Sequence, residues 1–318
     1  MTQSKPQVNS YEKEDYWWKY QPFFPESVRI TPERLPEETW WLWKDCTIHL
    51  DRYEVDNAPL TVLLLHGGGG HGRLLAPIGL MLQQQGYSVV APDLPGYGLS
   101  ICPKKRITYP EWVDCASDLL EAEKKRTGKP VVVFGLSLGG YLAYQVACQS
   151  RAAAGVIATT LADARLQIVR DQFAKNKWMS RLGLPLLIAF GGLLKGLRLP
   201  IKWFSKMHDI ANQPALCEVV CADPLGGGNW TPLGFMRSLF MCPPVIEPQD
   251  FDLCPVLLAH PAADRWTTPE ASLPFFDKIK GETSLVMLEN CGHIPIEEPG
   301  ISQMQKAIER FLQDSQLH

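Results

Sequence analysis

The strongest chemical signal in the chain is the pentapeptide GLSLG at residues 135–139. It directly follows the apolar run VVVF and opens a stretch with the residue spacing of a helix. A serine at a sharp strand-to-helix turn has a strained backbone and lies at the positive end of the helix. The flanking glycines let neighbouring segments approach closely. We therefore predict that Ser137 is a nucleophile.

A serine hydroxyl is a weak nucleophile and needs a base, which an acid must orient. Asp264 follows the apolar run at 256–260, and His293 follows the next run at 284–288. Each would be an ordinary loop residue in isolation, but both come after successive predicted strands, in the order Ser, Asp, His. We predict His293 as the base and Asp264 as the acid. Asp163, at the end of another predicted strand, is the alternative acid.

The glycine-rich loop HGGGGHG, which begins at His66, is the third chemical feature. Attack on a carbonyl creates an oxyanion, which needs preorganised N–H donors. We predict the backbone amides of Leu138 and Gly68 as this pair, with Gly69 as a further candidate. A phosphate loop is disfavoured because no GK[ST] follows and the GxGxxG context is missing. His66 is expected to orient the loop, whereas His71 either lines the site or faces solvent.

These residues require a framework of strands and helices that brings them to one edge. Continuous apolar runs predict buried strands, and they alternate with stretches of helical spacing, which indicates βαβ units and a parallel sheet. The alternation stops over residues 162–245, which are helical and Leu-rich with no clear strand, and then resumes. The predicted strands cover residues 61–66, 88–94, 131–136, 155–161, 256–260 and 284–288, with one or two short strands before them and a final amphipathic helix at about 299–313.

Four motifs in order resemble the α/β-hydrolase superfamily over residues 46–315. They are HGGGG, DLPGYGLS, GLSLGG and an Asp–His pair that ends in GHIPIEEP. The resemblance implies a mostly parallel central sheet with helices on both faces, an inserted helical cap and a serine nucleophile rather than the Asp of the dehalogenase and epoxide-hydrolase branches. One departure is His-Pro-Ala-Ala before Asp264, where many relatives carry a glycine. The expected organisation is an aromatic-rich extension (1–45), a core (46–161 and 246–318) and a cap (162–245).

The function that the resemblance implies is a serine hydrolase, and we expect a carboxylic ester hydrolase acting on small to medium acyl esters through an acyl-enzyme. An amidase, thioesterase, lactonase or C–C bond hydrolase fits the same three residues, because the fold does not choose between them. A non-catalytic protein that binds a small ligand is the remote alternative. No metal and no organic cofactor is expected.

Composition excludes several other classes. The chain has 318 residues, 46% hydrophobic and 20% charged, which excludes a disordered protein. Its net charge of −3 gives no electrostatic case for nucleic-acid binding. The nine cysteines are scattered without a CxxC pair, so a disulfide framework or zinc site is not expected. With no signal-peptide or membrane-spanning pattern, we predict a cytoplasmic protein.

The predicted cap decides the substrate. It carries ten Lys and Arg against five Asp and Glu, and it is rich in leucine and tryptophan. We predict an apolar pocket for an acyl chain beneath it. A basic and apolar lid also suits an anionic membrane surface, but we favour buried faces of cap helices over that contact. The aromatic stretch at residues 16–24 is expected to pack on its own domain. The sequence does not indicate an oligomeric state.

Overall fold

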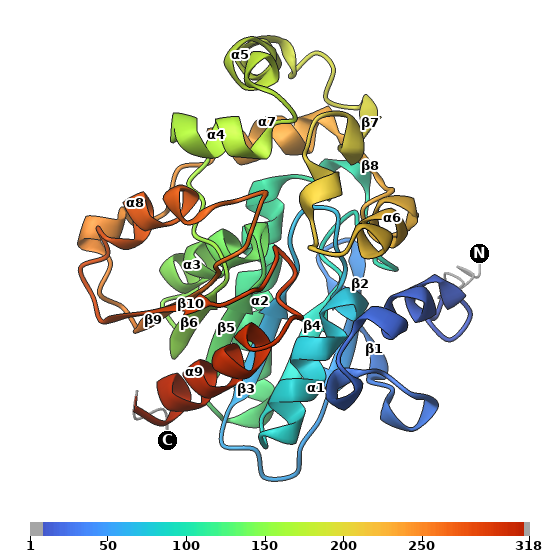
Figure 1. Cartoon of the computed structure of the whole chain (residues 1–318), viewed down its shortest axis with the longest axis vertical. Coiled ribbons are helices and arrows are strands. Elements are labelled where there is room, and N and C mark those ends of the chain that lie inside the picture. Colours follow the sequence, from blue (N-terminus) through green and yellow to red (C-terminus); the bar gives the residue numbers. More distant parts are fainter. Residues whose placement is uncertain (1–8, 315–318) are drawn as a thin grey trace.

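The computed structural model describes residues 9–314 (Figure 1). The first eight residues of the predicted extension and the last four of the predicted core therefore lie outside the described residues. None of the helices within residues 9–314 has the length and apolar character needed to cross a membrane.

A single eight-stranded sheet forms the centre of the molecule, in the order β1-β2-β4-β3-β5-β6-β9-β10. The six strands from β4 to β10 in this order run parallel, while β1 pairs antiparallel with β2 and β2 pairs antiparallel with β4. The strands are β1 (Glu37–Trp43), β2 (Cys46–Tyr53), β3 (Thr61–Leu65), β4 (Ser88–Pro92), β5 (Val131–Gly135), β6 (Gly155–Ala158), β9 (Val256–Pro261) and β10 (Thr283–Leu288). The predicted mostly parallel sheet is confirmed.

Helices cover both faces of this sheet. Successive side chains of a strand point to opposite faces, so each buried strand contributes to an apolar cluster on either side. Val62 and Leu64 of β3 belong to one apolar cluster, whereas Leu63 and Leu65 belong to the other. The first cluster includes side chains of α1 and α9, and the second includes side chains of α2, α3 and α8. These helices are α1 (Ala76–Gln84), α2 (Tyr109–Thr127), α3 (Leu138–Ser150), α8 (Leu273–Phe276) and α9 (Gly300–Asp314).

The region predicted as a cap lies at one end of the sheet and is mainly helical (Figure 1). Its helices are α4 (Gln167–Phe173), α5 (Leu184–Phe190), α6 (Pro214–Ala222) and α7 (Leu233–Met241). The expectation of no strand here is wrong, because β7 (Arg198–Pro200) and β8 (Trp230–Pro232) form a small antiparallel pair. Strands of three residues are too short to show an alternating pattern of burial.

Many apolar side chains of the cap are exposed, contrary to the expectation that its Leu-rich stretch forms buried faces. Leu193 has an exposed fraction of 87% and Trp178 of 76%. Further exposed examples are Leu182, Leu186, Phe190, Leu194, Leu197, Trp203 and Trp230.

The chain before residue 46 contributes to the core of the molecule. Its strand β1 pairs with β2, so the sheet begins at Glu37 and the predicted boundary falls between two paired strands. The 3₁₀ helix η1 (Asp15–Phe23) contacts α6 of the cap, and the 3₁₀ helix η2 (Glu26–Val28) contacts α1. We call residues 9–36 the aromatic segment. Figure 1 shows it in blue, alongside α1 and near α6.

Candidate active site

The structure brings the three residues predicted for catalysis into one hydrogen-bonded chain. Ser137 Oγ lies 2.7 Å from His293 Nε2, and His293 Nδ1 lies 2.8 Å from Asp264 Oδ2. Ser137 follows β5, Asp264 follows β9 and His293 follows β10, so all three come from the carboxyl ends of parallel strands. His293 and Asp264 are almost fully buried. The imidazole therefore has one fixed orientation between a hydroxyl and a carboxylate.

The Asp264 carboxylate is held in place by its own loop. The Trp266 and Thr267 amides donate to Oδ1 at 2.8 and 2.9 Å, and the Thr267 hydroxyl donates to Oδ2 at 2.8 Å. Burial raises the pKa of Asp264, but His293 and these hydrogen bonds outweigh it and lower the pKa to about 2. The carboxylate is thus ionised at neutral pH and accepts the Nδ1 proton of the imidazole.

Ser137 lies at a turn that only small neighbours permit. Its φ of 59° and ψ of −128° are strained for a residue with a side chain. A Cβ atom on Gly135 would come within 1.8 Å of the Gly139 carbonyl oxygen, and one on Gly139 within 2.3 Å of the Leu65 carbonyl oxygen. The two glycines of the pentapeptide are therefore required by close backbone approach, as the sequence indicated.

Two backbone amides beside Ser137 have no hydrogen-bond partner within the described residues, those of Gly68 and Leu138. Leu138 is the first residue of α3, where the amide is left free and the helix dipole is positive. The Gly69 amide instead interacts with the Tyr97 hydroxyl. Gly68 and Leu138 thus each leave a free N–H next to the serine.

The two histidines of the glycine-rich loop are buried, and their ring nitrogens bond to groups other than Ser137. His66 Nδ1 lies 2.8 Å from the Gly67 carbonyl, and its Nε2 accepts a hydrogen bond from the Leu94 amide, so it connects this loop to the loop after β4. Burial lowers the pKa of His66 to about 4, which keeps the ring neutral. His71 lies between Tyr11 and Asp223, within hydrogen-bond distance of both, rather than in solvent.

The alternative acid, Asp163, is engaged elsewhere. Both of its carboxylate oxygens accept hydrogen bonds from Arg165, with the closest nitrogen at 2.7 Å. Its carboxylate makes no hydrogen bond with His293 in the described part of the chain. Asp264 is therefore the carboxylate that the structure pairs with the imidazole.

Two small cavities meet at Ser137 and share Gly68. The first, of about 60 Å³, also borders His293, and its other lining residues are Tyr20, Phe24, His66, Gly67, Gly69, Gly70, Leu74, Leu75, Leu136, Ile210, Val220 and Ile294. The second, of about 40 Å³, lies on the Leu138 side and is lined further by Thr160, Ala162, Ala164, Val169, Phe173, Leu239, Phe240, Trp266 and Thr267. We call them the histidine-side cavity and the Leu138-side cavity.

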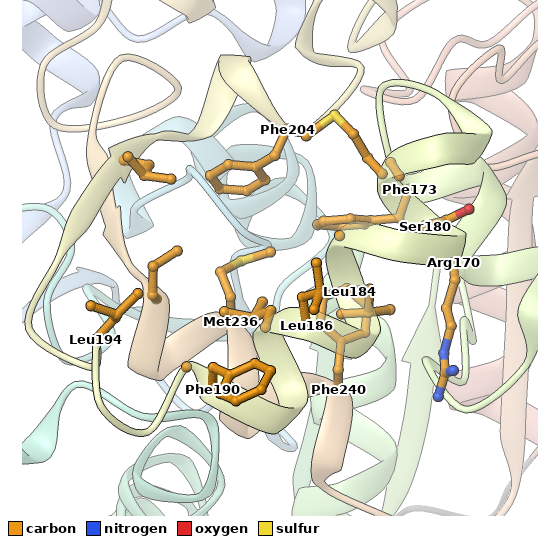
Figure 2. Close-up of a pocket in the computed structure, with 17 residues that line it drawn as sticks. Arg170, Phe173, Ser180, Leu184, Leu186, Phe190, Leu194, Phe204, Met236 and Phe240 are labelled. Atoms are coloured by element: carbon orange, nitrogen blue, oxygen red, sulfur yellow. The ribbon is translucent and has the colours of Figure 1, made fainter.

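A much larger apolar cavity of about 460 Å³ lies within the cap (Figure 2). It shares Phe173 and Phe240 with the Leu138-side cavity, and the centroids of these two rings are 5.9 Å apart. Only Arg170 and Ser180 bring charged or hydroxyl side chains to its lining. Arg170 Nε donates to the Ala164 carbonyl, and the Ser180 hydroxyl donates to Asp171. We call this space the cap cavity.

Behind the glycine-rich loop, a buried charge cluster holds this part of the site to the sheet. The Asp93 carboxylate accepts hydrogen bonds from the Gly72 and Leu99 amides and from the Tyr11 hydroxyl. His49 of β2 lies 3.1 Å from both Asp93 and Glu38, and 3.8 Å from Asp51. The remaining cation of the cluster is Arg73, which pairs with Asp51 at 2.6 Å and with Glu38 at 3.2 Å.

This cluster predicts a pH dependence of stability. Burial lowers the pKa of His49, but Asp93, Glu38 and Asp51 outweigh it and raise the pKa from 6.5 to about 10. The protonated ring therefore stabilises the fold below about pH 6.5, and this contribution is lost as the pH rises through about 10. In urea unfolding at several pH values, the stability difference between wild type and His49→Gln should shrink over this range. A difference that does not change with pH would contradict the assignment of a charged His49.

Four residues around the site were not predicted to belong to it. Thr267 bonds Asp264 and lies 3.1 Å from His293 Nδ1, and the Trp266 ring centroid lies 4.8 Å from that of His293. Thr267 follows the acid by three residues, a spacing typical of local turn hydrogen bonds. Tyr20 and Phe24 line the histidine-side cavity from the aromatic segment. No local sequence pattern could have placed these two side chains beside Ser137 and His293, which lie more than a hundred residues further along the chain.

Comparisons with known proteins agree with this fold. A family model described as alpha/beta hydrolase family matches residues 62–301. A thermostable monoacylglycerol lipase of Bacillus sp. (strain H-257) is 32% identical over 95 residues, which are 30% of this chain and 38% of the relative. The chain therefore matches well under half the length of this curated relative.

Solved structures resemble the chain over most of its length. A soluble variant of monoglyceride lipase from Saccharomyces cerevisiae, in complex with a substrate analogue, superposes with a TM-score of 0.72 at 17% identity, covering 92% of this chain and 98% of that one. Monoacylglycerol lipase of Paleococcus ferrophilus gives a TM-score of 0.68 at 22% identity, covering 84% and 99%. Since the family model spans most of the sequence and the sheet has the matching architecture, the chain belongs to the alpha/beta hydrolase family.

Proposed function

We propose that this chain hydrolyses carboxylic esters through an acyl-enzyme formed on Ser137. The observation that carries the proposal is the hydrogen-bonded chain from Ser137 through His293 to Asp264, next to the free amides of Gly68 and Leu138. A nucleophile, a base held by a buried carboxylate, and two donors for an oxyanion are the parts that acyl transfer requires.

Each part has one role in the proposed reaction. Ser137 Oγ attacks the ester carbonyl while His293 Nε2 takes its proton, and the carbonyl oxygen becomes an oxyanion that the Gly68 and Leu138 amides stabilise. The tetrahedral intermediate collapses, the C–O bond breaks, and the alcohol leaves with the proton from His293. A water molecule then attacks the acyl-enzyme by the same route, which releases the acid and restores Ser137.

The position of the base supports an assignment of the two small cavities to the two halves of the ester. His293 must deliver its proton to the leaving alcohol, so the alcohol belongs in the histidine-side cavity. The acyl part then lies on the opposite side of the scissile bond, in the Leu138-side cavity. From there, the ring pair Phe173–Phe240 is the boundary with the cap cavity.

The cap cavity supports an apolar acyl chain. Its volume of about 460 Å³ is of the size of a small-molecule site, and the residues labelled in Figure 2 are apolar apart from Arg170 and Ser180 at one side. An alkyl chain placed there is removed from water, which stabilises the complex by roughly 0.8 kcal/mol for each buried CH₂ group. We infer that the substrate has an apolar acyl chain that extends beyond the Leu138-side cavity.

The names of the relatives favour one ester class. Monoacylglycerol, the substrate in the names of two relatives, is an ester of an acyl chain with the small alcohol glycerol. A large apolar cavity on the acyl side and a small cavity on the alcohol side fit an ester of this kind. We therefore propose acyl esters of small alcohols as the substrate class. The cytoplasmic location expected from the sequence stays a prediction.

The proposal is tested by incubating the chain with a fluorophosphonate probe and with p-nitrophenyl esters of increasing acyl length. We expect covalent labelling, and turnover that rises with chain length as the acyl group reaches the cap cavity. A monoacylglycerol, an amide and a thioester of the preferred acyl group are compared in the same assay. Failure of the wild type to label above a Ser137→Ala control would sink the proposal. Labelling with efficient turnover of only the amide or thioester would replace the ester with that class.

A further inference from the structure

The aromatic segment forms one wall of the proposed alcohol site. Tyr20 and Phe24 line the histidine-side cavity together with Ser137 and His293, although they lie more than a hundred residues away from both in sequence. Tyr20 has an exposed fraction of 2% and Phe24 of 4%, and their rings stack with centroids 6.3 Å apart. Both side chains are thus part of the site rather than of the outer surface.

Hydrogen bonds from two tyrosines of η1 hold this wall in place. The Tyr20 hydroxyl donates to Asp223 Oδ2 at 2.8 Å, and the Tyr16 hydroxyl donates to the Val219 carbonyl at 3.0 Å. Val219 lies in α6, and Asp223 is the first residue after the end of that helix. The aromatic segment is therefore attached to the cap. Burial raises the pKa of Asp223, but His71 and the Tyr20 hydroxyl outweigh it and lower the pKa, so the acceptor is a carboxylate.

The same carboxylate connects the wall to the glycine-rich loop. Asp223 Oδ2 lies 3.3 Å from His71 Nε2, and His71 Nδ1 lies 2.9 Å from the Tyr11 hydroxyl. Tyr11 belongs to the aromatic segment and also donates to Asp93 at 2.9 Å. The segment is therefore attached to the cap at Asp223 and to the loop that carries the Gly68 amide at His71. A wall with these attachments has little freedom to move aside for a larger group.

The rest of the cavity lining and the cavity volume limit the size and polarity of the group that can bind there. Leu74, Ile210, Val220 and Ile294 make the lining around the wall largely apolar. The volume of about 60 Å³ suits a small group only, because one water molecule already needs about 10–15 Å³ on this measure. Among the lining side chains without a polar atom, that of Phe24 is the largest. Its ring therefore occupies space in the cavity without making a hydrogen bond.

We propose that the aromatic segment determines alcohol specificity, with Tyr20 and Phe24 limiting the size of the leaving alcohol. The proposal rests on the proposed ester hydrolysis, since only that reaction makes the histidine-side cavity an alcohol site. It assigns the two halves of the substrate to separate parts of the chain. The aromatic segment selects the alcohol, and the cap cavity selects the acyl chain.

The test is a set of hexanoate esters of methanol, glycerol, cyclohexanol and 2-naphthylmethanol, with acid release followed by titration. Phe24→Ala should raise kcat/KM for the two bulky alcohols relative to methanol by about tenfold or more, the scale on which pocket shape discriminates substrates. The preference for acyl length, measured with methyl esters, should not change. Phe24→Leu should give a smaller shift in the same direction, and it keeps the test informative if Phe24→Ala fails to fold.

Phe23→Ala is the matched control, because Phe23 is the adjacent ring of the same segment and does not line the cavity. It should leave the alcohol preference as in the wild type. Ester turnover by a folded Phe24→Leu with wild-type alcohol preference, or the same shift in Phe23→Ala, would overturn the inference while leaving the proposed function intact. A wild type without ester turnover would overturn both.

Discussion

Replacing Ser137 with alanine is expected to lower kcat for the preferred ester by about 10⁵- to 10⁶-fold, the scale of nucleophile removal in serine hydrolases. The substitution deletes only Oγ, the atom that lies 2.7 Å from His293 Nε2. Alanine has the same backbone strain at φ 59° as serine, so the thermal midpoint should stay close to that of the wild type. Steady-state kinetics, fluorophosphonate labelling and thermal unfolding measure the three effects.

The control for this variant is Ser150→Ala at the end of α3, the helix that follows Ser137, because Ser150 lines neither of the two cavities at Ser137. It should keep wild-type turnover. A Ser137→Ala protein that retains more than about 1% of kcat, after titration of active sites, would show that another group attacks the ester. In that case the strained turn at Ser137 has a structural rather than a chemical role.

The central strands could be predicted because burial on both faces leaves a direct trace in the sequence. A strand covered by helices on both sides is apolar at every position, as in TVLLL of β3 and VVVFG of β5. Strand β1 has the sequence EETWWLW, and six of its seven side chains are not buried. At the edge of a sheet, pairing is decided by the neighbouring strand β2, so the residues of β1 alone do not indicate it.

The centre of the site was predictable for a different reason. Ser137, Asp264 and His293 each follow a recognisable strand, and parallel strands place their carboxyl ends at one edge. Tyr20 and Phe24 reach the same place through contacts of the aromatic segment with α6 and α1, which are long-range packing. The aromatic stretch is buried against α1 of the core and α6 of the cap, but the sequence gives no sign that it packs beside Ser137.

The exposure of apolar side chains in the cap also could not be predicted from the sequence. An apolar helical face has one pattern in sequence whether another element covers it or not. Leu186, Leu187 and Phe190 of helix α5 all line the cap cavity, but Leu186 and Phe190 are also more than half exposed to solvent. The sequence therefore predicted an apolar region correctly, but not that several of its side chains remain at the surface.

The second large effect is expected for Asp264→Asn, which should lower kcat by about 10⁴-fold while leaving the fold nearly intact. The carboxylate accepts the Nδ1 proton of His293 at 2.8 Å and so leaves Nε2 free to take the proton of Ser137. An asparagine amide donates where the carboxylate accepts, which favours the opposite tautomer of the imidazole. In serine proteases, the same change lowers turnover by about four orders of magnitude through the wrong tautomer.

The lowered pKa of Asp264 also predicts how the stability difference between wild type and Asp264→Asn changes with pH. Because the folded-state pKa is lowered from 3.8 to about 2, the ionised carboxylate stabilises the fold above about pH 4, and this contribution is lost as the pH falls through about 2. Wild type and Asp264→Asn should therefore differ most in stability above pH 4 and converge in acid. Chemical denaturation between pH 2 and 7 measures this difference.

Asp163→Asn provides the matched comparison, because Asp163 is also a buried aspartate after a strand of the same sheet but binds Arg165 at 2.7 Å instead of the histidine. It should lose stability through the broken ion pair and retain most of its kcat. Activity assays on both purified variants decide between the two acids. If Asp163→Asn proved inactive and Asp264→Asn active, the carboxylate assignment would be wrong, although Ser137 and His293 would keep their roles because their 2.7 Å contact does not depend on which acid is used.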